Sequence, residues 1–420
     1  MNNTSDFSQS DSLLRDRIAR FKDRIQTDEP RVRAWVWTIS ERKILEDAST
    51  RPVGETSPLG STLFGVKDII DVAGMPTRYG SRAYEHATVA PADAACVALL
   101  RQAGAIPVGK TVTAELAYAQ PGLTRNPWNP EHTPGGSSSG SAAAVAAGMV
   151  PFALGTQTGG SVIRPAAYCG VVGFKASRGA VSMSGIKPVS ESFDSLGWFT
   201  RSVRDAINIG RVLMEEDLCS YDFTGIPKLG VLTQVGPTTV DGESAEALSG
   251  VVQLLERSGI HPKWVQLPIN TEQLHILQRK IMTHEMYRNF AYERLHAADR
   301  LGKLTLAAIR EGQAVTTTEY VRSLNQLRLI TARATDEIIR FDALLTYSAP
   351  GPAPKGHTHT GESSCNRVWS ALGCPALHLP TGLSNNGLPI GVQLVAMPWS
   401  DLRLLEIGQQ IERLINWRAQ

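Results

Sequence analysis

The chain has 420 residues, a formal net charge of +2, and hydrophobic and charged fractions of 42% and 20%. This composition is typical of a globular protein, and the length suits one large domain or two ordinary ones. A net charge so close to zero gives no reason to expect nucleic acid or an anionic membrane as a partner.

The first part of the chain alternates between helical and strand patterns. Residues 1–10 are polar, so we expect a disordered N-terminus and a domain that spans residues 11–420. Leu13, Leu14, Ile18, Phe21 and Ile25 recur at helical spacing and predict an amphipathic helix over residues 12–25. The next predicted elements are a strand at 32–39, a strand at 62–66 that ends at Lys67, a helix at 93–103, a strand at 105–108 and a short element at 111–118.

Two loops rich in glycine and serine, at 135–141 and 155–161, flank a small apolar segment. This segment predicts a buried helix that ends at about Ala147, followed by a strand up to Leu154. Glycine lets backbone approach a ligand closely, so the loops suggest amides and hydroxyls held around one small reactive group. A flexible linker and a phosphate cradle are alternatives, although neither loop has a common phosphate-binding pattern. Composition alone leaves these interpretations open.

The residue order in the loops is more specific than their composition. They read G-G-S-S-S-G-S and G-T-Q-T-G-G-S-V-I-R-P-A, and the chain here resembles the amidase signature family. The resemblance implies a catalytic triad of Lys67, Ser137 and Ser161, with the lysine in an upstream G-V-K-D segment and Ser137 on a cis peptide bond. It covers roughly residues 59–396 and implies an amide hydrolase that uses no cofactor or metal.

The second half of the chain also alternates between strands and helices. The expected helices lie at 203–216, 244–258 and 402–416, and the expected strands at 228–232, 343–347 and 387–393. Residues 271–342 are largely helical and are expected to lie over the substrate cleft. Alternating strands and helices predict an α/β fold, and the resemblance implies one large domain whose mixed central sheet is covered by helices on both faces.

A serine hydroxyl is a poor nucleophile until a base takes its proton, and a lysine is a base only when neutral. Burial would lower the pKa of Lys67 from about 10.4 towards the working pH. Our hypothesis is that Ser161 attacks the amide carbonyl while Ser137, oriented by Ser138, relays the proton to Lys67. The expected oxyanion hole consists of the backbone amides of Thr158, Gly159 and Gly160.

Two positions depart from the commonest family pattern. Gln157 stands where most members have Asp, and the arginine that usually follows the nucleophile by two residues is here Arg164, three residues on. The run T-Q-T-G-G-S-V-I-R-P resembles the malonamidase group, so Gln157, Ser138 and Arg164 are candidate substrate-binding residues. Arg164 would anchor a substrate carboxylate, and the alternative is a structural arginine paired with Asp194 or another carboxylate.

The remaining expectations concern compartment, metals and partners. The cysteines Cys96, Cys169, Cys219, Cys365 and Cys374 are odd in number and lack C-x-x-C spacing, which indicates reduced thiols rather than disulfides or a zinc site. His357 and His359 lie in a loop without a clear pattern of acids, so no metal is expected. No secretory leader or bilayer-spanning run is recognisable, which favours a cytoplasmic protein without a membrane partner.

Three functions compete. The leading one is a cofactor-free hydrolase of a small, carboxylate-bearing amide, which the resemblance suggests to be a homodimer. The second is the glutaminase-type subunit of a tRNA-dependent amidotransferase. The third is a non-enzymatic relative that binds small acids, against which the intact Lys67, Ser137 and Ser161 argue.

Overall fold

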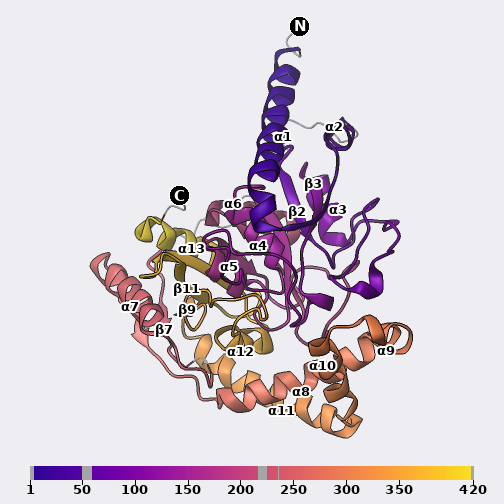
Figure 1. Ribbon diagram of the computed structural model, residues 1–420. Helices are drawn as coiled ribbons and strands as arrows, with labels where there is room; N and C mark the ends of the chain where they lie inside the picture. The colour runs from indigo at the N-terminus through magenta and orange to yellow at the C-terminus, as the bar shows by residue number, and fades with distance from the viewer. Residues whose placement is uncertain (1–3, 50–58, 216–224, 235, 418–420) are drawn as a thin grey trace.

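A single mixed sheet forms the centre of the structure. The computed structural model in Figure 1 describes residues 4–49, 59–215, 225–234 and 236–417. Within these ranges the sheet has 11 strands in the order β1-β3-β2-β4-β6-β5-β10-β11-β9-β7-β8. The strands are β1 (Trp35–Thr38), β2 (Leu63–Lys67), β3 (Ile106–Thr111), β4 (Phe152–Gln157), β5 (Val172–Lys175), β6 (Ser195–Thr200), β7 (Leu229–Val231), β8 (Lys263–Trp264), β9 (Ala343–Tyr347), β10 (Ala376–Leu383) and β11 (Pro389–Val395). Strand β2 pairs in parallel with β3 and β4, whereas β10 pairs antiparallel with β5 and β11, which confirms the predicted mixed sheet.

Helices cover both faces of this sheet. The helices are α1 (Thr4–Val32), α2 (Glu41–Ser49), α3 (Ala95–Gln102), α4 (Ser139–Ala146), α5 (Ile163–Cys169), α6 (Val203–Leu213), α7 (Gly242–Arg257), α8 (Thr271–Asn289), α9 (Ala291–His296), α10 (Lys303–Gln313), α11 (Thr317–Ile338), α12 (Ser364–Leu372) and α13 (Asp401–Ile415), with short 3-10 turns η1 (Arg82–Tyr84), η2 (Glu115–Ala117) and η3 (Ala298–Arg300). Leu377 of β10 lies against Gly408 of α13. The next residue, His378, pairs with Gly173, which lies against α5. Because neighbouring strand residues point to opposite faces, α13 and α5 cover different sides.

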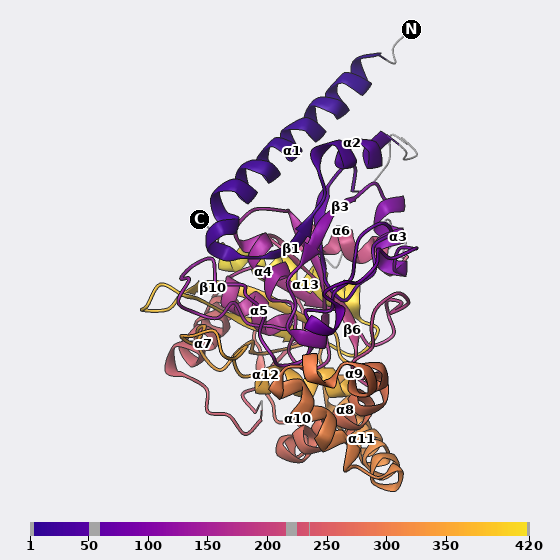
Figure 2. The ribbon, with the colours of Figure 1, turned by 45° about the vertical axis from the view of Figure 1, so that its right-hand side comes forward.

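The N-terminal helix is longer than the sequence predicts. Helix α1 begins at Thr4, within the range 1–10 where disorder is expected, and residues 1–3 lie outside the described ranges; the expected disorder stays a prediction. Leu14, Ile18 and Phe21 are buried and fix the helix to the body. Adding residues to an existing helix costs far less than starting one, so polar residues can extend it. Figures 1 and 2 show this end projecting away from the sheet.

The segment 271–342 is helical, as expected. It contains α8 to α11, which lie together at one end of the molecule, below the sheet in Figure 2. Helices α10 and α11 pack on α8, and α8 packs on α12. Glu285 of α8 joins the segment to the rest of the protein by accepting a hydrogen bond from Ser192 Oγ (2.5 Å), and it joins α8 to α11 by accepting one from Tyr320 Oη (2.6 Å). Helix α8 is therefore held in place between the sheet-covering layer and the outer helices.

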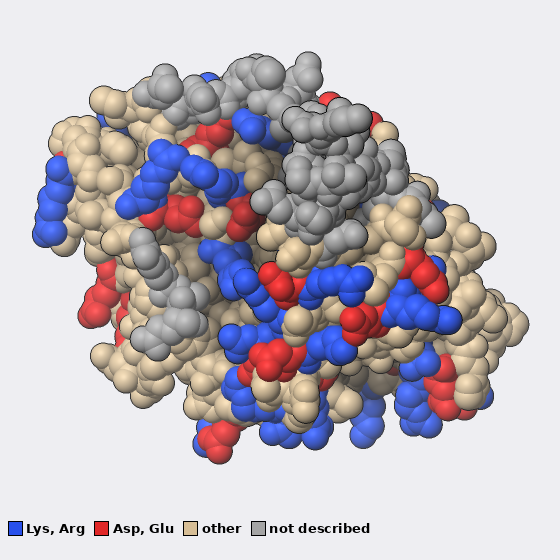
Figure 3. Space-filling view, turned by 90° about the horizontal axis from the view of Figure 1, so that it is seen from above, with Lys and Arg blue, Asp and Glu red and all other residues tan. Residues whose placement is uncertain are grey.

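The surface around α1 carries both signs of charge. Figure 3 looks down on the end from which α1 projects and shows basic and acidic side chains interspersed there. Several of them pair, as in Lys22 with Glu41 at 2.7 Å and Lys43 with Asp47 at 2.9 Å. Exposed pairs such as these contribute little to stability. Among the described helices, none is long and apolar enough to cross a lipid bilayer.

Candidate active site

Lys67 is the last residue of β2, and all five residues of that strand are buried. Strands β3 and β4 flank β2, so the lysine side chain leaves the sheet in a region closed to water. Its Nζ lies 2.8 Å from Ser137 Oγ and 2.9 Å from Thr156 Oγ1. The structure therefore brings the predicted base and the predicted relay serine into direct hydrogen-bond contact.

Burial controls the charge of this lysine. Its side chain is fully buried, and desolvation holds the pKa of Lys67 well below its ordinary value, although the carboxyl of Asp194 opposes the shift. Desolvation favours the neutral amine, and a neutral amine can accept a proton. At a separation of 2.8 Å from Ser137 Oγ, the amine is within reach for proton transfer.

Ser137 begins the turn into α4 and is fully buried. The Gly136–Ser137 peptide bond is cis, as the family resemblance implies. The loop of Ser137 packs closely on α5, the helix that follows Ser161, because a Cβ on Gly135 would lie 2.7 Å from Pro165 Cα. The two glycine-rich loops also approach each other directly, since a Cβ on Gly155 would lie 2.9 Å from Ser138 Oγ.

Ser161 faces a pocket of about 140 Å³ whose wall also includes Thr158, Gly159 and Gly160. Ser161 is 8% exposed, which leaves its hydroxyl open to a small ligand. In the part of the chain that the structure describes, this hydroxyl makes no hydrogen bond, so the step from Ser161 to Ser137 stays a prediction. Catalytic hydrogen bonds are often long before substrate binds and tighten in the complex.

The backbone amides predicted to form the oxyanion hole are available to a ligand. Across the described residues, the N–H groups of Thr158, Gly159 and Gly160 have no hydrogen-bond acceptor. Thr158 is held by Asp194, whose carboxylate accepts its hydroxyl at 2.5 Å and also accepts two backbone amides. Burial raises the pKa of Asp194 to about 6. Unpaired amides fixed beside a candidate nucleophile suit a developing oxyanion.

Two of the predicted substrate-binding residues do not reach the pocket. Gln157 is fully buried, and its Oε1 accepts the amides of Val162 and Ile163 at 2.8 and 3.1 Å. These are the first amides of α5, so Gln157 caps the helix that follows Ser161. Ser138 is also fully buried and bonds the backbone of Thr156. Both residues therefore support the site rather than line it.

Arg164 does line the pocket. Its Nη1 donates to Gly361 O at 2.6 Å and its Nη2 to Gly136 O at 2.5 Å, so it joins three segments around the site. Burial lowers the pKa of Arg164 to about 10. The alternative of a pair with Asp194 is not observed, because the bonding partners of Arg164 are carbonyl oxygens.

No sequence pattern pointed to three polar residues of the pocket wall. Arg367 comes from α12, Glu362 from the loop before it, and Gln278 from α8. Gln278 Nε2 donates to Thr158 O at 3.3 Å, which ties α8 to the oxyanion loop. Helix α12 was not among the predicted elements, since its sequence S-C-N-R-V-W-S-A-L has no distinctive boundary residues.

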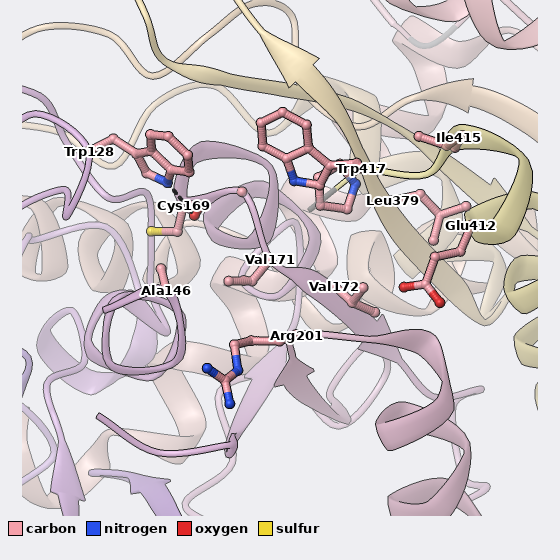
Figure 4. Close-up of a pocket in the computed structure, with 12 residues that line it drawn as sticks. Trp128, Ala146, Cys169, Val171, Val172, Arg201, Leu379, Glu412, Ile415 and Trp417 are labelled. Atoms are coloured by element: carbon pink, nitrogen blue, oxygen red, sulfur yellow. Dashed lines mark hydrogen bonds between the residues drawn. The ribbon is translucent and has the colours of Figure 1, made fainter. Parts of the chain in front are cut away.

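A second hollow lies at the other end of α5, where Figure 4 shows Trp128 bonded to Cys169 and Trp417 on the pocket wall. It holds only about 30 Å³ and is lined by none of the predicted site residues. That volume is too small for an organic substrate. Within the described ranges, no group of three or more His, Cys, Asp or Glu residues is arranged to hold a metal ion.

Free amides and a nucleophile candidate around one small pocket, with a buried amine bonded to the candidate relay serine behind it, suit a site for acyl transfer. A comparison with protein-family models agrees: the family described as Amidase matches residues 16–405, and the chain belongs to it. The protein is therefore an enzyme of the amidase class, which acts on the C–N bond of amides. This result also confirms the predicted single α/β domain with a mixed sheet.

Individual relatives cover nearly the whole chain. A glutamyl-tRNA(Gln) amidotransferase subunit from Synechococcus sp. is 31% identical and covers 98% of this chain and 95% of its own length. A Mycobacterium bovis protein named "Putative amidase AmiA2" is 31% identical, with coverages of 94% and 89%. The native peptide amidase from Stenotrophomonas maltophilia has a TM-score of 0.81 and 28% identity, covering 97% of this chain and 94% of its own. These relatives differ in what their names say they do, so they do not single out a substrate.

Proposed function

We propose that the protein hydrolyses a small linear amide through an acyl-enzyme, with Ser161 as nucleophile, Ser137 as proton relay and Lys67 as base. The observation that carries this proposal is the 2.8 Å contact between Lys67 Nζ and Ser137 Oγ. It occurs where burial holds the pKa of the lysine well below its ordinary value. A fully buried lysine is rare unless it has a partner or a task.

The proposed reaction has two stages, formation of an acyl-enzyme and its hydrolysis. Ser161 Oγ forms a bond to the substrate carbonyl carbon while its proton passes to Ser137 and the Ser137 proton passes to Lys67. The carbonyl oxygen becomes an oxyanion held by the free amides of the 158–160 loop, each of which contributes several kcal/mol at most. The proton then returns through Ser137 to the leaving nitrogen, the C–N bond breaks, and ammonia or an amine departs. Water attacks the remaining ester by the same relay and frees Ser161.

The size and polarity of the pocket favour a small substrate. Its volume of about 140 Å³ lies below the range of about 300 to 1,000 Å³ that is usual for drug-sized ligands. The malonamidase-like run around Arg164 fits a short amide with a free carboxylate. A homodimer in the cytoplasm is part of the same proposal, and light scattering of the purified protein tests the oligomeric state.

A second function has specific support. The 31% identity to an amidotransferase subunit extends over 98% of this chain, so a glutaminase that passes ammonia to a partner is the alternative. The two proposals differ in what the isolated protein does. A free hydrolase releases ammonia from small amides without any partner, whereas an amidotransferase subunit needs its other subunits for efficient turnover.

The test combines labelling with turnover. A fluorophosphonate probe should label the wild-type protein on Ser161, and the Ser161→Ala variant should not react. Lys67→Ala should lose ammonia release from a panel of small amides. The control is Lys175→Ala, since Lys175 is equally buried but donates to Ala176 O at 2.8 Å and lies on β5, which β4 and β6 separate from β2. Full activity of a folded Lys67→Ala variant would refute the proposed base.

A further inference from the structure

Three charged side chains face the pocket beside Ser161: Arg164, Arg367 and Glu362. They are close enough to influence one another electrostatically, yet no ion pair joins any two of them among the described residues. Two guanidinium groups and one carboxylate leave a local charge of +1. A pocket with an excess positive charge favours an anionic ligand over a neutral one.

The two arginines differ in the hydrogen bonds they already make. Both terminal nitrogens of Arg164 donate to backbone carbonyls, at 2.6 Å to Gly361 and 2.5 Å to Gly136. Its Nε is buried without a partner, so that edge of the guanidinium is closed to solvent. The bonds across two loops make Arg164 a brace of the site, in which each terminal nitrogen is already tied to a backbone carbonyl and keeps one N–H group.

Arg367 has fewer of its terminal N–H groups occupied than Arg164. Its Nε donates to Ser363 Oγ at 2.9 Å, and its Nη1 has one long contact with Gln278 Oε1 at 3.4 Å. Its Nη2 has no protein acceptor among the described residues. The side chain is thus oriented by α12 and α8 but keeps N–H groups free. A carboxylate can bind the edge of such a guanidinium through two parallel hydrogen bonds.

The position of Arg367 relates it to the reacting carbonyl. A Cβ on Gly159 would lie 3.8 Å from Arg367 Cγ, so the stem of the arginine passes beside the middle of the oxyanion loop. Arg367 and the oxyanion loop line the same pocket, so a substrate carbonyl bound by that loop shares this pocket with the arginine. Glu362, whose Oε1 accepts the amides of Ser363 and Ser364 at 2.7 and 3.0 Å, borders the same pocket and disfavours a second negative charge.

We infer that Arg367 selects the substrate by binding a single carboxylate, and that the preferred substrates are half-amides of short dicarboxylic acids. This inference rests on the proposed function, since it assigns a residue that acts on the substrate of that same site. It differs from the sequence-based expectation, which gave the carboxylate to Arg164.

The experiment compares matched amides in Arg367→Gln and wild-type protein. The anionic substrates are malonamate and succinamate, and their neutral counterparts are propionamide and butyramide. For the anionic amides we expect KM to rise on the order of 10- to 100-fold at nearly unchanged kcat, the usual range for a lost charged hydrogen bond. KM for the neutral amides should change less than about twofold. Arg367→Lys should restore part of the loss.

Arg279→Gln is the matched control. Arg279 interacts electrostatically with Arg367 but pairs with Glu311 at 2.7 Å and does not line the pocket. If its loss raised KM for anionic amides as much as the loss of Arg367, the effect would come from the general field and the inference would be wrong. An equal KM change for both classes in Arg367→Gln would also overturn it. Failure of wild-type protein to hydrolyse any amide, with Ser161 unlabelled, would instead refute the proposed function.

Discussion

Replacing Lys67 with methionine removes the proposed base while keeping most of the side-chain volume. The amine contacts two hydroxyls, Ser137 Oγ at 2.8 Å and Thr156 Oγ1 at 2.9 Å, and the side chain is fully buried. General-base catalysis is worth about 10²- to 10⁴-fold, so we expect kcat for amide hydrolysis to fall by that factor, or by ~3 to 5 kcal/mol in the barrier.

The stability of this variant should change little. Two hydroxyls each lose a hydrogen bond worth about 1 kcal/mol net, but methionine avoids the cost of burying an amine. We expect the free energy of unfolding to change by less than about 2 kcal/mol. Whether the variant is more or less stable than wild type depends on pH. Because the pKa of Lys67 is lowered in the folded state, the unfolded chain binds the proton more tightly, and the free energy of unfolding of the wild type rises with pH.

The assay is ammonia release as a function of pH, alongside thermal unfolding. Wild-type kcat/KM should fall as pH drops through the lowered pKa of Lys67, because protonation removes the base. The residual activity of Lys67→Met should lack this limb. A folded Lys67→Met protein that retained more than about a tenth of wild-type kcat would contradict the reasoning, since one general base supplies at least about 10²-fold.

Three further predictions address the frame of the site. Ser138→Ala leaves the backbone of Thr156 short of a partner and should lower the free energy of unfolding by about 1 to 3 kcal/mol, as measured by urea denaturation. Gly135→Ala, at φ +83° and with its Cβ 2.7 Å from Pro165, should displace the loops and reduce kcat more than about tenfold, whereas Gly382→Ala, where a Cβ meets nothing, should not. Burial lowers the pKa of His378 to about 3, so its contribution to stability is present above about pH 6.5 and lost as pH falls. Wild-type protein should therefore lose about 2 kcal/mol more than His378→Gln between about pH 7 and pH 5, and equal losses would show that His378 is not responsible.

The sequence predicts the part of the site that is built from neighbouring residues. The glycine-rich loops, Ser137 and Ser161 lie within one continuous stretch, and the end of an apolar strand points to Lys67. The structure brings Lys67 to Ser137 across 70 positions, which the family resemblance implied and periodicity alone did not. Strand patterns were informative because buried β2 and β4 each begin with an apolar run that precedes their polar last residues.

The pocket wall could not be predicted in the same way. Arg367 and Gln278 reach the oxyanion loop from α12 and α8, far along the chain, and only the packing of those helices creates their contact. Gln157 was expected to bind substrate because it departs from the family pattern, yet its amide group satisfies the start of α5 and the hydroxyl of Ser370. A residue that departs from the family motif can therefore reflect different hydrogen bonds within the protein rather than a different substrate.

The end of β4 connects the base, the nucleophile and the oxyanion amides through three consecutive side chains. Thr156 contacts the amine of Lys67, Gln157 caps the helix that follows Ser161, and Thr158 is fixed by a carboxylate. Side chains alternate between the two faces of a strand. Inserting or deleting one residue here would therefore move all three side chains away from their present partners at once. Attempts to redesign substrate preference should leave this tripeptide intact and vary α8 and α12, whose contributions to the pocket are independent of the strand's spacing.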